Sequence, residues 1–142
     1  MSILPEGSLS GADLIRQFLP TSPYVGHLGI QLITLEPGVA ELSLPFASPL
    51  VTIGTIVHGG AIASLIDTAA GVAAWSDAQV PTKVRSTTVN LTVTYLAPAE
   101  QEDLQATARV LHRGRTLVYL DVEVRSTSGR AIAKGLVTYK LG

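Results

Sequence analysis

The sequence predicts an α+β fold in which one long helix packs against about six mostly antiparallel strands. Three observations carry this prediction: an apolar helical run near residues 58–77, period-two alternation after Pro81, and glycine-containing turns between the strand-like segments. A sheet of this kind beside a single helix is expected to curl around it. The whole chain, 1–142, is expected to form one domain, with a helical segment over 1–20.

The first elements follow in chain order. Ser10 precedes apolar residues at helical spacing that stop at Pro20, which predicts a short helix. Residues 28–46 hold two strand-like runs around a Pro-Gly turn, which predicts a hairpin. His27 is expected in a loop before this hairpin, and 47–57 in a loop before the long helix.

The second half of the chain predicts four more strands. The first alternates apolar residues with threonine and asparagine, and its apolar members are Val89, Leu91, Val93 and Tyr95. Further strands are expected near 103–112, 116–127 and 130–140, separated by short turns at Gly114 and Gly129.

Composition excludes several classes of protein. The chain is 46% hydrophobic and 15% charged, against roughly 25% charged in an average domain, which favours an oligomer. A net charge of −1 argues against nucleic-acid binding, and the apolar runs are shorter than the roughly 18 residues of a membrane span. The chain contains no cysteine, so disulfides and thiolate chemistry are excluded. Its first residues do not resemble an export signal, so a cytoplasmic location is expected.

The long helix carries one acid, Asp67, in its middle. At 100° per residue, the neighbours on the face of Asp67 are all small: Gly60, Ala63, Ser64, Ala70 and Gly71. This face leaves space for a ligand or another surface to approach the carboxylate. The alternative is an ordinary solvated or salt-bridged acid, and Trp75 on the same helix is expected in the core or a dimer interface.

His58, Gly59 and Gly60 begin this helix. Exposed N–H groups at a helix N-terminus can bind an oxygen that becomes negative, and a carboxylate can act as nucleophile or general base, so the pair suggests acyl transfer. His58 lies about 13 Å along the axis from Asp67, too far to share a substrate atom within one chain. Two helices antiparallel across a two-fold axis would bring them together. The alternative for His58 is a capping role.

Three stretches together resemble a known family: VHGGAIASLIDTAAG, STTVNLTVTYLAPA and RGRTLVYLDVEVRSTSGRAIAKGLVTY. They are similar to the hotdog-fold acyl-CoA thioesterases of the phenylacetic-acid-degradation type, the PaaI-like family. The resemblance implies a helix wrapped by a curved sheet, paired into a homodimer or a dimer of dimers. It implies that Asp67 is nucleophile or general base, that the Gly59 amide polarises the carbonyl, that His58 positions the loop, and that Thr88 holds the attacking water.

Further residues are expected to contact the substrate. Several relatives have asparagine six residues before the histidine, where this chain has Thr52. The phosphates of coenzyme A are expected at the turn around Gly114, with Lys83 and Arg85 as additional cations. The full expected set is Thr52, Gly60, Ser64, Thr68, Arg113 and Arg115.

The sequence therefore predicts an acyl-CoA thioesterase that uses no metal and no cofactor apart from the coenzyme A of its substrate. Two alternatives stay open. One is a hotdog hydratase or dehydratase acting on acyl thioesters, and the other is a non-catalytic acyl-CoA-binding module.

Overall fold

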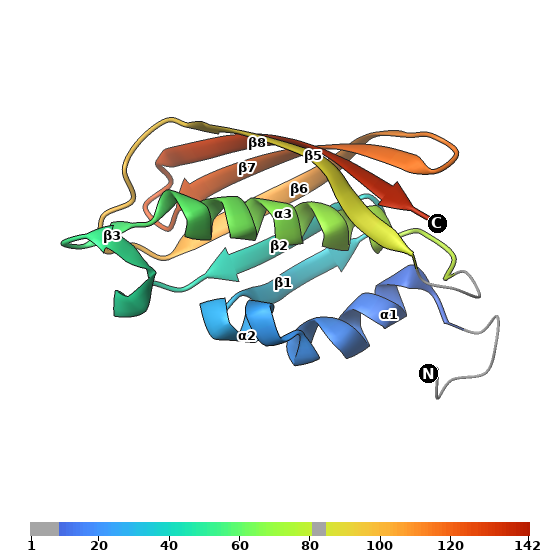
Figure 1. The fold of residues 1–142 in the computed structure, drawn as a ribbon, viewed down its shortest axis with the longest axis horizontal. Coiled ribbons are helices and arrows are strands. Elements are labelled where there is room, and N and C mark those ends of the chain that lie inside the picture. The colour runs from blue at the N-terminus through green and yellow to red at the C-terminus, as the bar shows by residue number, and fades with distance from the viewer. Residues whose placement is uncertain (1–8, 81–84) are drawn as a thin grey trace.

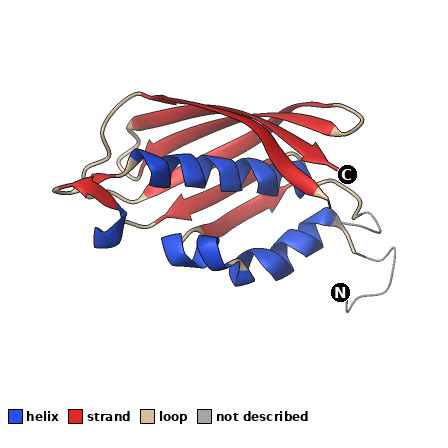
Figure 2. Cartoon of the chain, viewed as in Figure 1, coloured by secondary structure: helices blue, strands red, loops and turns tan. Residues whose placement is uncertain are grey.

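The computed structural model describes residues 9–80 and 85–142. One long helix, α3 (Gly59–Trp75), lies across a six-stranded sheet that curves around it (Figures 1 and 2). The strands lie in the order β1-β2-β6-β7-β8-β5, and all neighbours are antiparallel. Their bounds are Gln31–Glu36 for β1, Val39–Leu44 for β2, Ser86–Tyr95 for β5, Leu104–Arg113 for β6, Leu117–Ser126 for β7 and Ala131–Leu141 for β8. The predicted α+β hotdog fold is confirmed.

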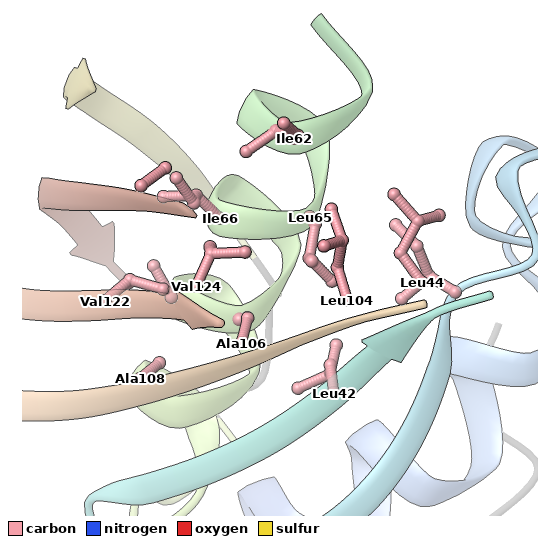
Figure 3. Close-up of a cluster of buried hydrophobic side chains, with 14 of the residues drawn as sticks. Leu42, Leu44, Ile62, Leu65, Ile66, Leu104, Ala106, Ala108, Val122 and Val124 are labelled. Atoms are coloured by element: carbon pink, nitrogen blue, oxygen red, sulfur yellow. The ribbon is translucent and has the colours of Figure 1, made fainter. Parts of the chain in front are cut away.

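The core lies between α3 and the concave face of the sheet. Period-two alternation puts every second side chain of β6 and β7 against the helix, and Leu65 and Ile66 of α3 are fully buried against them (Figure 3). Gly135 of β8 allows the closest approach, because a Cβ at this position would lie 2.5 Å from Ile66 Cγ2.

The hairpin turns follow the prediction. Gly38 between β1 and β2 and Gly129 between β7 and β8 have φ angles of +78° and +89°, a region that favours glycine. Ser76, just after α3, ties the first turn to the helix: its Oγ accepts from Gly38 N at 2.7 Å and donates to Ala73 O at 2.7 Å.

The N-terminal region contains one more helix than predicted. α1 (Gly11–Phe18) begins at Ser10, whose Oγ accepts from Asp13 N, as expected. A 3-10 turn, η1 (Leu19–Thr21), then leads into α2 (Pro23–Leu28). The prediction that His27 lies in a loop is wrong, because His27 is in the last turn of α2. Six residues are too few for a helical periodicity, although the flanking proline and glycine are typical helix boundaries.

The segment before α3 is also more ordered than the predicted loop over 47–57. It contains the turn η2 (Ser48–Leu50) and two short paired strands, β3 (Val51–Ile53) and β4 (Ile56–Val57). Strands of two and three residues are too short to recognise by alternation. His58 N donates to Leu50 O of η2 at 2.7 Å, so this turn fixes the start of α3.

β5, at one edge of the sheet, contains a bulge that changes which side chains face α3. Thr88 pairs with Tyr139 of β8, but Asn90 pairs with the next residue, Thr138, so Val89 is an extra residue. Without the bulge, Thr88 and Tyr95 would lie on opposite faces of the strand. With it, both side chains point toward α3 and contact it.

The convex face of the sheet carries charged side chains beside exposed apolar ones such as Tyr119 and Leu136. Lys134 lies between Asp121 and Glu123 there, and its hydrogen bond with Asp121 is the main cause of a raised Lys134 pKa. In the described part of the chain, no helix has the length and apolar character needed to cross a membrane.

Candidate active site

Asp67 lies half-buried in the middle of α3, beside β5. Thr88 Oγ1 donates to Asp67 Oδ1 at 2.5 Å. Among the described residues, none donates a hydrogen bond to the second carboxylate oxygen, Oδ2. The hydrogen bond to Oδ1 therefore orients the carboxylate, and Oδ2 stays available to accept a hydrogen bond from a ligand. The structure brings Thr88 and Asp67 together, and their expected roles in the reaction stay predictions.

His58 caps the N-terminus of α3. Its Nδ1 accepts from Gly60 N at 2.7 Å, so the proton of the neutral ring is on Nε2. His58 O accepts from the N–H groups of Ala61 and Ile62 at 3.0 and 3.2 Å. The capping alternative for His58 is thus the contact observed, and its expected role in positioning the loop stays a prediction.

The Gly59 N–H points out of the helix end. N–H and C=O of a trans peptide point in opposite directions, and the carbonyl of the His58–Gly59 peptide points along α3 to its bonds with Ala61 and Ile62. Within the described ranges, the Gly59 N–H has no hydrogen-bond acceptor in the protein. It is a free donor at the positive end of a helix of 17 residues.

Tyr95, which the sequence analysis did not assign to the site, contacts the same segment. Its hydroxyl donates to Gly59 O at 2.6 Å. The only sequence signal was its position in the alternating strand, and the bulge hid the face on which it lies.

Ser64 and Thr68 lie on the Asp67 side of α3 and donate to main-chain carbonyls one turn earlier. Ser64 Oγ donates to Gly60 O at 2.9 Å, and Thr68 Oγ1 donates to Ser64 O at 2.7 Å. The hydroxyl oxygen of Tyr24, in α2, lies 3.0 Å from Ser64 Oγ. Tyr24 acts as the donor, because the Ser64 hydroxyl proton is already donated to Gly60 O. The sequence analysis missed this phenol together with α2.

Two aromatic residues close the site beyond Asp67. A Cβ built on Gly71 would lie 3.3 Å from the Tyr139 ring. The ring therefore fills the space that the missing side chain leaves. Trp75 is 4% exposed and its Nε1 donates to the Tyr139 hydroxyl at 3.2 Å. Trp75 is therefore a core residue, which agrees with the prediction.

The other expected substrate contacts lie farther from Asp67. Thr52 is exposed in β3, and Gly60 is exposed in the first turn of α3. The turn around Gly114 is at the C-terminal end of α3, opposite Gly59: Arg113 forms an ion pair with Asp77 and donates to Ala74 O at 3.1 Å. Arg115 and Arg85 are exposed, and Lys83 lies outside the described residues.

Chemically, the site offers a carboxylate held by a hydroxyl and a free amide at a helix N-terminus. This pair can supply a base or nucleophile and a donor for an oxyanion. Asp67 lies eight positions after Gly59, about 12 Å along a helix. One carbonyl group cannot reach both within a single chain.

The fold and this site together define a hotdog protein with an acid on its central helix. Comparison with known proteins agrees: a sequence model of the thioesterase superfamily matches residues 54–133. The chain belongs to the thioesterase superfamily. The expected enzyme class, a thioester hydrolase, is confirmed at this level.

Individual relatives support the same family. YigI of Escherichia coli K12, named as a medium/long-chain acyl-CoA thioesterase, is 29% identical over 89% of this chain and 90% of its own. A thioesterase family protein of Silicibacter pomeroyi superposes with a TM-score of 0.84 at 30% identity, covering 93% and 98% of the two chains. The E. coli PaaI protein of the phenylacetic acid degradation operon superposes with a TM-score of 0.71 at 25% identity, covering 82% and 86%. The resemblance to the PaaI-like family is confirmed.

Proposed function

We propose that the protein is an acyl-CoA thioesterase in which Asp67 drives hydrolysis and the Gly59 amide binds the carbonyl oxygen. The observation that carries the proposal is the Thr88–Asp67 hydrogen bond of 2.5 Å, which orients a half-buried carboxylate on an otherwise apolar helix. The name of the relative YigI supports acyl-CoA as the substrate class.

The chemistry needs only these groups and water. In one route, Asp67 takes a proton from water, and the resulting hydroxide attacks the thioester carbon. In the other, Asp67 attacks first and forms a mixed anhydride that water then hydrolyses. In both routes, the Gly59 N–H stabilises the negative oxygen and the C–S bond breaks, and coenzyme A leaves as a thiol that carries a proton released by the water. Neither route uses a metal or a further cofactor.

We further propose that each site is shared between two copies of the chain. The helical distance between Gly59 and Asp67 supports a shared site, because one carbonyl group must meet both, and β5 supplies a surface for pairing. β5 is an edge strand of ten residues with Val89 55% and Leu91 37% exposed. Pairing of β5 with its copy across a two-fold axis would run the two α3 helices antiparallel. A dimer and a dimer of dimers both satisfy this, and a cytoplasmic location stays a prediction of the sequence.

The test is thiol release, followed with a chromogenic disulfide, from phenylacetyl-, benzoyl-, short-, medium- and long-chain acyl-CoA. Wild type is compared with Asp67→Asn, and Asp13→Asn on the exposed first turn of α1 is the matched control. We expect Asp67→Asn to lose about 100-fold or more in kcat, because an amide is a poor base and nucleophile. The control is expected to keep wild-type rates.

Each other outcome points elsewhere. Equal rates in wild type and Asp67→Asn would rule out the mechanism. Binding without thiol release would favour a binding module, and hydration of an enoyl thioester would favour a hydratase.

A further inference from the structure

The segment that carries the proposed oxyanion donor is held by two side chains from different elements. Tyr95, at the end of β5, donates its hydroxyl proton to Gly59 O at 2.6 Å. His58 Nδ1 accepts from Gly60 N at 2.7 Å. The Gly59 carbonyl and the Gly60 N–H belong to the same peptide, so this peptide is bound at both of its polar groups.

The Tyr95 ring also touches the backbone at this point. A Cβ built on Gly59 would lie 3.3 Å from both Cζ and the hydroxyl oxygen of Tyr95. The ring therefore packs directly on the Gly59 backbone. Tyr95 itself is 50% exposed to solvent. Position and hydrogen bond together restrict the Gly59–Gly60 peptide to one orientation.

Two adjacent glycines would otherwise be free to rotate, since glycine has the widest range of backbone angles. The peptide before Gly59 is fixed by the bonds from Ala61 and Ile62 to His58 O. The peptide after it is fixed by Tyr95 and His58. The Gly59 N–H belongs to the first of these two peptides. Because the peptide on the other side of the Gly59 Cα is held as well, the N–H has a set direction before any substrate arrives, which is what an oxyanion donor requires.

We propose that Tyr95 is a positioning residue for the Gly59 amide. The proposal rests on the proposed thioesterase function, and it assigns to Tyr95 no contact with the reacting atoms. Its hydroxyl holds the Gly59–Gly60 peptide, which follows the peptide that carries the donor N–H, in place from β5, the strand that also carries Thr88 to Asp67. One strand thus orients both the acid and the amide of its own chain, which in the proposed dimer belong to two different sites.

The test is Tyr95→Phe, which removes the hydroxyl and keeps the ring on Gly59. Loss of a whole oxyanion donor costs about 100-fold or more in kcat, so a misdirected donor is expected to cost about 10-fold. KM and the melting temperature are expected to stay near wild type, because substrate binding and packing do not use this hydroxyl. Tyr119→Phe, on the exposed convex face of β7, is the matched control and should keep wild-type kinetics.

A second measurement separates positioning from simple stabilisation of the helix end. His58→Ala releases the other side of the same peptide, so its effect on kcat and that of Tyr95→Phe should not multiply in the double variant. Effects that multiply fully would overturn the proposal. A wild-type kcat for Tyr95→Phe would do the same, as would failure of this variant to fold, which would assign the hydroxyl to stability.

The outcomes for the proposed function are distinct. Asp67-dependent hydrolysis with an unaffected Tyr95→Phe would leave the thioesterase in place and overturn only the role of Tyr95. If the wild type hydrolysed no thioester, or if Asp67→Asn hydrolysed it as fast as the wild type, both proposals would be overturned.

Discussion

Thr88 Oγ1 lies 2.5 Å from Asp67 Oδ1 and joins the edge strand β5 to the middle of α3. The bond fixes one carboxylate oxygen and leaves Oδ2 without a donor among the described residues. The oxygen that faces the substrate in the proposed reaction is therefore Oδ2. A carboxylate oriented in this way needs no rearrangement when water or a thioester arrives.

Replacing Thr88 should lower turnover without abolishing it. Thr88→Val keeps the shape and removes the donor, so the carboxylate loses its orientation and kcat should fall about 10-fold. Thr88→Ser keeps the hydroxyl and should stay within about threefold of wild type. The measurement is kcat at saturating thioester for both variants. A loss in Thr88→Val as large as in Asp67→Asn would show that Thr88 takes part in the chemistry itself.

An acid on the edge of β5 should separate the two copies of the proposed dimer. Val89 is 55% exposed at the bulge of β5. An added charge there would be buried by pairing and would oppose it. Val89→Asp should therefore be a monomer whose kcat/KM is about tenfold lower or worse. Ile33→Asp is the control, because Ile33 is 51% exposed at the bulge of β1, the opposite edge of the sheet. Light scattering after size exclusion measures the mass. A dimeric, active Val89→Asp would contradict the shared site.

The two arginines beside Gly114 should behave differently. Arg113 bonds to the end of α3 through Ala74 O and Asp77, so Arg113→Ala should cost about 1 kcal/mol and lower the melting temperature by about 3 °C. Arg115 is exposed in the same turn and, like Arg113, lines a hollow of about 360 Å³, but it makes no ion pair among the described residues. Arg115→Ala should raise KM for acyl-CoA severalfold and leave stability unchanged.

Calorimetry and steady-state kinetics on the same two preparations test this difference. The reverse pattern, with KM changed only in Arg113→Ala, would mean that Arg113 exchanges its helix contacts for the phosphates.

A methyl group at Gly135 should destabilise the fold. The added Cβ would lie 2.5 Å from Ile66 Cγ2 in the fully buried layer between β8 and α3. Overpacking of this kind costs about 1–3 kcal/mol, which denaturant unfolding measures. Combined with Ile66→Ala, which removes the clashing atoms, Gly135→Ala should cost less than the two single changes summed, by at least about 0.5 kcal/mol. Strict additivity would show that the backbone moves apart instead.

The long elements of this fold were predictable because their patterns span many residues. α3 has 17 residues and the strands after it have ten, so each repeats its period often enough to be identified. Glycine in the sequence marked the turns at Gly38 and Gly129, where the structure has positive φ angles. α2, β3 and β4 were missed because two to six residues cannot display a period.

The site was predictable in part for the same reason. Asp67 stood out as the only acid on an apolar helix, and the family resemblance pointed to Thr88. Tyr24 and Tyr95 were not assigned, because their contacts depend on α2 and on the bulge in β5, and neither leaves a mark in the alternation.

The bulge at Val89 also limits how the length of β5 can change. Thr88 and Tyr95 are seven positions apart, and they share a face only because one intervening residue is out of phase. Deleting or inserting a single residue between them would turn one of the two side chains to the convex face. Either the Thr88–Asp67 bond or the Tyr95–Gly59 bond would then be lost. A change of two residues would keep both side chains inward but shift their spacing by about 7 Å. This stretch of the chain should therefore tolerate substitutions far more readily than any change in its number of residues.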